Sequence, residues 1–261
     1  MSNLAVRLLP VPLFLAAWEA GCRMAESTYF PPPSLIAARA RELWFSGPAT
    51  RLFLTDAAIE NFVPSLGRMF GGWLLACFAG IVAGVAIGRS ATLSAYLDPL
   101  IQFGRAIPPP ALVPVFIVVF RDDLRMLLAT IVIGVVWPVL LNAVDGARYV
   151  DRVQVDTARV FGLTRTQRLV RLVLPAAAPK IFAGLRLSLS LALVLLVVAE
   201  MTNGTINGIG YELVYMQQSF DMPGMWGIVA LLAVLGLVLN LSFLLLERRT
   251  LSWHRLARRA V

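Results

Sequence analysis

Charged residues are scarce in this chain: 15% of its 261 residues are Asp, Glu, Lys or Arg, whereas 59% are hydrophobic. Soluble domains carry about 25% charged residues, so the composition excludes an ordinary soluble domain. Apolar runs of about 20 residues, enough to cross a bilayer as a helix, recur along the sequence, and one domain of several spans accounts for its length. The predicted fold is therefore an all-α integral membrane bundle.

Residue types that build reactive sites are also rare. His254 is the single histidine, and Cys22 and Cys77 lie in apolar segments without paired spacing, which predicts neither a disulfide framework nor a metal site. The single lysine, Lys180, follows Pro179 rather than a glycine-rich turn, which excludes a phosphate-binding P-loop. We therefore expect no catalytic residue, no bound metal and no ATP hydrolysis by this chain.

Arginine supplies nearly all of the positive charge behind a net charge of +8. The arginines gather between apolar runs and in the C-terminal tail, as in membrane proteins whose cytoplasmic loops are positive. This placement argues against a nucleic-acid partner. The richest clusters lie in the 145–180 segment and after residue 246, so both termini are predicted to be cytoplasmic, which requires an even number of spans.

About six spans are predicted, the first of them a retained helix rather than a cleaved signal peptide. They cover residues 8–25, 66–87, 96–120, 124–144, 181–201 and 226–246. Between the first two, residues 29–64 predict an amphipathic interfacial helix that Ser34 caps. Residues 202–224 predict a loop with one short helix. The sequence thus divides into an N-terminal part, 1–63, a membrane core, 64–255, and a basic tail, 256–261.

The second span carries Gly80, Gly84 and Gly88 at four-residue spacing. Small residues at this spacing let helix backbones approach closely. We therefore expect these glycines to serve helix packing and not a ligand.

Several polar or helix-breaking residues fall inside predicted spans. Five prolines, Pro108 among them, interrupt the third span, which also contains Arg105. Broken backbone at membrane depth is tolerated only against protein or a water-filled cavity, and ionisable groups such as Arg105 and Glu200 usually face the interior. Arg105, Pro108 and Glu200 are candidate pathway residues, and for the two ionisable residues structural pairing or an interfacial position is the alternative. Asn142 is expected to hydrogen-bond across helices.

The basic segment 145–180 keeps a helical apolar periodicity, which predicts a folded helix–turn–helix on the cytoplasmic side. Gly162 offers the turn and Pro175 is expected to end the second helix. Arg165, Arg168 and Arg171 form a basic face that is either solvated or in contact with a partner or lipid head groups. One apolar face is formed by Val153, Thr157, Val160 and Phe161.

This segment resembles the EAA loop of binding-protein-dependent ABC importer permeases. That loop is Glu-Ala-Ala, three residues, Gly, nine residues, then Ile-x-Leu-Pro. The spacing agrees throughout, with Asp for Glu, Thr for the first Ala, and Leu for Ile. The matching residues are Asp156, Thr157, Ala158, Gly162, Leu172, Leu174 and Pro175.

Further segments resemble the nitrate/sulfonate/taurine branch of these permeases. They are residues 103–114, Val198-Ala199-Glu200-Met201 followed by Gly208-Ile209-Gly210, and the ending Leu246-Glu247-Arg248-Arg249. The turn at 120–123, Phe-Arg-Asp-Asp, departs from the branch. The resemblance implies a small anion as the solute, with a vitamin precursor such as a pyrimidine as the alternative.

The resemblance also implies the partners of the chain. A second copy would complete the pathway as a homodimer in the inner membrane, and separate ATPase subunits would bind ATP and Mg²⁺. The helix around Asp156–Gly162 would sit in a groove of the ATPase, and an extracytoplasmic solute-binding protein would deliver the solute. The competing class, an ion-driven secondary transporter, should show more intramembrane acids and repeated halves, neither of which is found.

Overall fold

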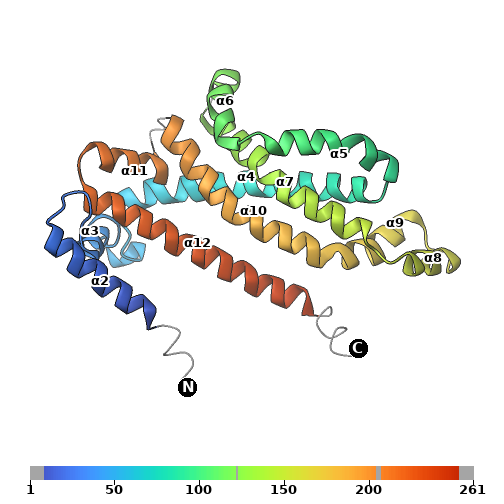
Figure 1. Ribbon diagram of the computed structural model, residues 1–261, viewed down its shortest axis with the longest axis horizontal. Helices are drawn as coiled ribbons and strands as arrows, with labels where there is room; N and C mark the ends of the chain where they lie inside the picture. Colours follow the sequence, from blue (N-terminus) through green and yellow to red (C-terminus); the bar gives the residue numbers. More distant parts are fainter. Residues whose placement is uncertain (1–8, 122, 204–206, 253–261) are drawn as a thin grey trace. The chain divides into compact units, whose positions relative to one another are not determined.

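The structure is a computed structural model that describes residues 9–121, 123–203 and 207–252. Within these residues every regular element is a helix (Figure 1), as the composition predicts. The predicted tail 256–261 and His254 lie outside the described residues. The helices are α2 (Pro10–Ala25), α3 (Pro33–Trp44), η1 (Ala49–Arg51), α4 (Asp56–Gly88), α5 (Ala91–Ala106), η2 (Pro109–Leu112), α6 (Val113–Phe120), α7 (Asp123–Arg148), α8 (Arg152–Val160), α9 (Arg165–Arg168), η3 (Leu169–Val173), α10 (Leu174–Asn203), α11 (Ile209–Gln218) and α12 (Met222–Thr250).

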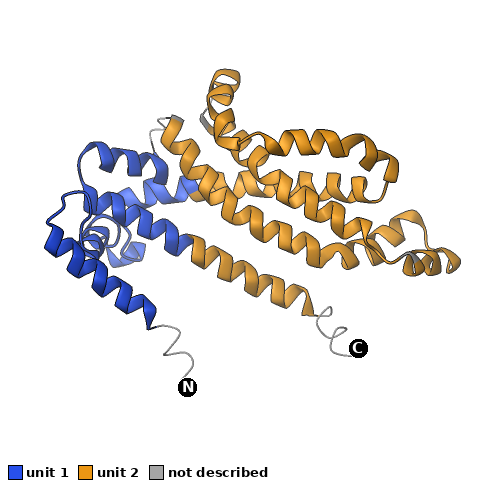
Figure 2. Cartoon of the chain, viewed as in Figure 1, with its two compact units in different colours: residues 1–65, 204–235 blue, residues 66–203, 236–261 orange. Residues whose placement is uncertain are grey.

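The chain forms two compact units, which Figure 2 distinguishes by colour. Unit 1 comprises residues 1–65 and 204–235, and unit 2 comprises residues 66–203 and 236–261. The long helices α4 and α12 contribute residues to both. The boundaries at residues 63 and 255 remain a prediction from sequence.

Four helical stretches are long and apolar enough to cross a membrane, or up to five if the bent pair α5 and η2–α6 is one span. The predicted count of six is not confirmed. The described part of the first predicted span is α2, whose 16 residues reach about 24 Å at 1.5 Å per residue. That is less than the roughly 30 Å of a bilayer core.

Helices α4 and α7 of unit 2 pack closely at the glycines of α4. A Cβ added at Gly84 would lie 2.6 Å from the carbonyl oxygen of Leu140, and one at Gly88 would lie 2.5 Å from that of Val144. A side chain at either position would force the helices apart. Their four-residue spacing therefore serves packing, as predicted.

The third predicted span is broken. Helices α5 and η2–α6 meet at 82°, and the break falls at Pro108 and Pro109, which have no N–H to continue the ladder of α5. The break packs against α7: a Cβ at Gly104 would lie 2.6 Å from the Trp137 ring, and one at Gly134 would lie 3.1 Å from Pro109. One side of the break is thus packed against α7, while Pro108 and Pro110 are exposed in this single chain.

Two expectations about polar and helix-breaking residues are wrong. Asn142 does not hydrogen-bond across helices, because its amide donates to the Pro138 carbonyl one turn back at 2.8 Å. Pro175 does not end a helix, because α9, η3 and α10 run on without interruption. The Leu174 N–H donates to the Leu169 carbonyl in a π-helical turn, and this shift in hydrogen-bond register accommodates a residue without an N–H.

Unit 1 has its own apolar core around a tryptophan. The Trp44 side chain is 1% exposed and packs with Phe62, their ring centroids 5.7 Å apart. Ile209 and Met216 of α11 join the same cluster. The predicted interfacial helix is therefore α3, and the loop predicted at 202–224 holds one short helix, α11.

Helix α3 begins differently from the prediction. Its N-cap is Pro32, and Pro33 takes the first position, where a missing N–H costs nothing. Ser34 is not the cap. Its N–H and hydroxyl donate to the Glu19 carboxylate at 3.0 and 2.7 Å, which joins α3 to α2.

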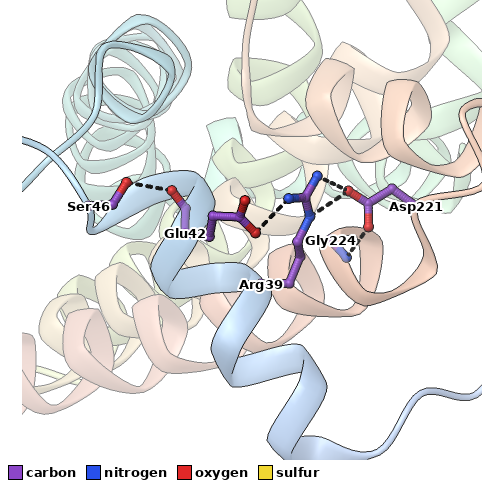
Figure 3. A network of polar contacts seen from close by, with 5 residues as sticks. All are labelled: Arg39, Glu42, Ser46, Asp221 and Gly224. Atoms are coloured by element: carbon purple, nitrogen blue, oxygen red, sulfur yellow. Dashed lines mark hydrogen bonds and ion pairs between the residues drawn. The ribbon is translucent and has the colours of Figure 1, made fainter.

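A polar network fixes α3 beside the start of α12 (Figure 3). The Arg39 guanidinium donates to the Asp221 carboxylate at 2.9 Å and to Glu42 at 2.7 Å, and the other Asp221 oxygen accepts from the Gly224 N–H at 3.0 Å. The Asp221 hydrogen bond, and then that of Glu42, raise the pKa of Arg39. Both carboxylates therefore favour the charged form of Arg39.

The first turn of α11 is capped from α4. Asn61 Oδ1 accepts from the Gly208 N–H and Ser65 Oγ from the Ile209 N–H, both at 2.9 Å, which satisfies donors that a helix start leaves free. The Asn61 amide also donates to the Glu212 carboxylate at 3.2 Å. Burial raises the pKa of Glu212, because an apolar environment disfavours the charged carboxylate.

Candidate coupling loop and pathway residues

Helix α8 carries the first half of the EAA-like sequence and has apolar residues on two sides. Its N-cap is Asp151, whose side chain accepts from the Val153 N–H at 2.8 Å. Val155 and Ala158 are buried and Val155 packs in a cluster with Val173 of η3. Elsewhere on α8 and at its C-cap, large apolar side chains are exposed. They are Val153 at 71%, Val160 at 87% and Phe161 at 77%.

Two backbone hydrogen bonds define the turn after α8. Gly162 has a φ of +72°, which favours glycine, and its N–H donates to the Arg159 carbonyl at 2.9 Å while the Leu163 N–H donates to the Ala158 carbonyl at 3.0 Å. These two bonds make a Schellman motif. Gly162 is thus the turn residue that the sequence predicts.

A capping box then starts α9. The Thr164 hydroxyl accepts from the Gln167 N–H at 3.3 Å, and the Gln167 side chain accepts from the Thr164 N–H at 2.9 Å. Such reciprocal bonds satisfy two free donors of a helix start. The signal T-x-x-Q is in the sequence at 164–167, but the sequence reasoning missed it.

The structure brings some EAA-like residues together and separates others. Thr157, Ala158 and Leu172 line one cavity of about 370 Å³ between α8 and η3. Asp156 lines a different cavity, of about 710 Å³, and pairs with Arg159 at 2.8 Å. Pro175 is exposed at the second position of α10.

The candidate pathway residues have different environments. Glu200 is fully buried in α10, and its carboxylate accepts from Arg68 of α4 at 2.9 Å. Glu200 is therefore held in a buried ion pair, and its role in the pathway stays a prediction. Arg105 is exposed in the last turn of α5, and Pro108 is the N-cap of η2 at the break. Arg68 was not predicted from the sequence. It lies 132 residues before its partner, and no pattern in the neighbouring sequence indicates this pair.

Known proteins resemble this chain over most of its length. A family model described as "binding-protein-dependent transport system inner membrane component" matches residues 76–252. A permease of Bacillus subtilis (strain 168) assigned to aliphatic sulfonate transport is 33% identical over 95% of this chain and 86% of its own. The taurine transport system permease protein of Escherichia coli (strain K12) is 28% identical over 97% and 90%.

A further curated relative and a solved structure also resemble this chain. The bicarbonate transport system permease protein of Synechococcus elongatus is 34% identical over 76% of this chain and 72% of its own. Among solved structures, a chain of the inward-facing MetNI methionine ABC transporter superposes with a TM-score of 0.57 at 16% identity, over 72% of this chain and 94% of that one. The latter likeness shows the fold alone.

The family match covers more than half of the chain, and the Bacillus subtilis permease is identical to it at a third of the aligned positions over most of its length. A permease of this kind is a non-catalytic, multi-pass inner membrane subunit that works with a separate ATPase. The chain belongs to the binding-protein-dependent transport system inner membrane components, as the permease subunit of an ABC importer.

Proposed function

We propose that this permease imports a small oxyanion of the sulfonate class. The observation that supports the proposal most is the identity of 33% over 95% of the chain with the aliphatic sulfonate permease, followed by the taurine permease at 28% over 97%. Sulfonate, taurine and bicarbonate, which the relatives' names give, are all small molecules with an anionic oxygen group. A pyrimidine-like solute, the alternative from sequence, gains no such support.

The coupling mechanism that we infer depends on the shape of α8. Val153, Val160 and Phe161 expose large apolar side chains that need a partner surface, and a groove on the ATPase would cover them. The Schellman motif and the capping box leave the turn at Gly162 little freedom. Helix α8 would therefore move as a rigid piece when the ATPase subunits close.

Movement of α8 would reach the membrane bundle through its buried side. Val155 packs in one cluster with Val85 of α4, Ala143 of α7 and Ala177 of α10. Because packed interfaces switch between discrete arrangements rather than deform continuously, a displaced α8 would favour one arrangement of these helices over the other. Alternating access would follow from that switch.

The remaining partners and the orientation belong to the same proposal. A second copy of this chain would complete the pathway, with the break at Pro108 and Arg105 beside it, and a soluble binding protein would deliver the solute from outside. The arginines around α8 and α9 favour a cytoplasmic location of this end. Both termini would then be cytoplasmic, and ATP with Mg²⁺ would be bound by the ATPase subunits alone.

Uptake into proteoliposomes tests the solute class. The chain, its ATPase and one candidate binding protein at a time would be reconstituted, with ATP on the ATPase side, and uptake of labelled taurine, an alkanesulfonate, nitrate, bicarbonate and a pyrimidine compared. ATP-dependent uptake of a sulfonate supports the proposal. Uptake of the pyrimidine without any anion would refute the class while leaving the permease role intact.

A further inference from the structure

Two adjoining cavities of unit 2 lie beside α8, outside the apolar surface just described. One has a volume of about 710 Å³ and the other of about 350 Å³, and both are lined by Arg89, Val155 and Arg159. Small-molecule sites span about 300–1,000 Å³. Each cavity is therefore large enough for a small ion or a lipid head group.

Arginines from four parts of the chain converge on these cavities. They are Arg89 after α4, Arg148 at the end of α7, Arg159 in α8, and Arg165 and Arg168 in α9. The only carboxylates in the two linings are Asp98 and Asp156. The cavities thus hold more positive than negative charge.

The two carboxylates are already engaged. Asp156 pairs with Arg159 at 2.8 Å, and Asp98 lies 3.8 Å from Arg148. The Arg89 guanidinium, in contrast, donates to the Ala147 carbonyl at 3.4 Å. Within the described part of the chain no carboxylate pairs with Arg89, and the same holds for both arginines of α9.

Backbone N–H groups at the start of α5 add to the positive electrostatic potential of the larger cavity. The first turn of α5, a helix of 16 residues, lines the larger cavity, and Ser90 caps it by accepting from the Leu93 N–H at 3.2 Å. Helix starts favour anions because their N–H groups and dipole point outward. The cavity therefore combines guanidinium groups with a helix start on one concave surface.

We propose that these cavities bind a phosphate-type oxyanion, either free or as the head group of an anionic lipid. Guanidinium groups match phosphate oxygens in geometry and charge. The tendency of cytoplasmic loops to be positive accounts for the sign of the charge but not for its convergence on the cavities from four parts of the chain. The proposal rests on the proposed function only for the cytoplasmic location of the site.

Occupancy would affect coupling. An anion held between Arg89, which follows the membrane helix α4, and Arg159 of α8 would tie the coupling helix to the bundle. The concave shape favours such a small anion over an acidic surface of the ATPase, which would meet the exposed apolar residues of α8 instead. Binding would therefore modulate transport without replacing the ATPase contact.

Two binding measurements on the purified full-length chain in phosphatidylcholine nanodiscs test the proposal. The first titrates inorganic phosphate against chloride at equal ionic strength and follows thermal unfolding. The second adds phosphatidylglycerol and counts bound lipids by native mass spectrometry. Arg89→Gln should weaken binding at least tenfold in one of the two, which corresponds to about 1.4 kcal/mol. The measurement that responds identifies the source of the oxyanion.

The control is Arg249→Gln, which removes the same charge from the exposed last turn of α12 and should leave binding unchanged. Arg89→Lys should retain part of the affinity and shows that position 89 tolerates replacement. Equal binding by Arg89→Gln and Arg249→Gln in both measurements would overturn the proposal. Neither measurement involves ATP or the imported solute, so the outcome is independent of the proposed function.

Discussion

Replacing Gly162 tests the effect of backbone conformation in the coupling turn without changing side-chain packing around it. A Cβ added at Gly162 would meet no atom within 4 Å, yet the residue has a φ of +72°. The free-energy cost of a substitution at Gly162 therefore comes from holding the new residue at a positive φ, and not from a steric clash with neighbours. The series Gly162→Asn, Gly162→Ala and Gly162→Pro varies that cost while leaving the surroundings unchanged.

The costs follow from backbone sterics. Asparagine visits left-handed conformations more readily than other residues with a side chain, whereas alanine pays roughly 1–2 kcal/mol there. One to two kcal/mol changes the ratio of native to non-native turn by about 5–30-fold. Proline cannot adopt a positive φ and lacks the N–H that bonds to the Arg159 carbonyl, so its cost is about 3 kcal/mol or more.

The assay is the amount of solute imported per ATP hydrolysed, measured in proteoliposomes with the ATPase and a loaded binding protein. We expect this ratio to fall in the order Gly, Asn, Ala, Pro, with Gly162→Pro uncoupled and all variants inserted in the membrane at equal levels. Wild-type coupling in Gly162→Pro would refute the reasoning. So would a loss in Gly162→Asn as large as that in Gly162→Pro, because side-chain presence and not φ would then matter.

Five further variants test the packing and electrostatics by thermal unfolding in detergent. Gly84→Ala, whose Cβ would lie 2.6 Å from a carbonyl oxygen, should destabilise by about 1–3 kcal/mol, whereas Gly67→Ala, with nothing within 4 Å, should stabilise by about 0.4–1 kcal/mol. Arg68→Ala should cost about 3–5 kcal/mol by leaving the buried Glu200 without this partner, and a double change of both residues to methionine should be more stable than Arg68→Ala. Because the pKa of Glu212 is raised in the folded protein, its contribution to stability is complete below the ordinary value of 4.5 and is lost as the pH rises through the raised value. The free energy of unfolding of Glu212→Gln should therefore fall less than that of the wild type between pH 4.5 and 8. Parallel curves of unfolding free energy against pH for the two proteins would contradict this.

Patterns with a local cause were predictable from sequence. The spacing of Gly80, Gly84 and Gly88 predicted the close approach of α4, because backbone contact between helices requires the absence of side chains at that repeat. Gly162 predicted the turn because few other residues adopt its φ. The prolines at 108–110 predicted the broken span, because several consecutive N–H groups are missing there.

Features that depend on neighbours were not predictable in this way. Glu200 was recognisable as a costly intramembrane charge, but its partner Arg68 is brought to it only by the packing of α4 against α10. Ser34 was assigned as a cap because its N–H and hydroxyl are local donors and acceptors, whereas Glu19 of another helix takes both. Pro175 was assigned as a helix end because sequence gives no sign of the π-helical turn that accommodates it.

ATPase activity of the co-purified complex tests the central claim, that this permease couples solute delivery to a separate ATPase. The tagged chain would be expressed with its ATPase and mixed with candidate binding proteins, each loaded or empty. The account predicts a stable complex whose ATP hydrolysis rises with one loaded binding protein and falls back in Gly162→Pro. A chain that purifies without any ATPase and moves solute down an ion gradient would contradict it.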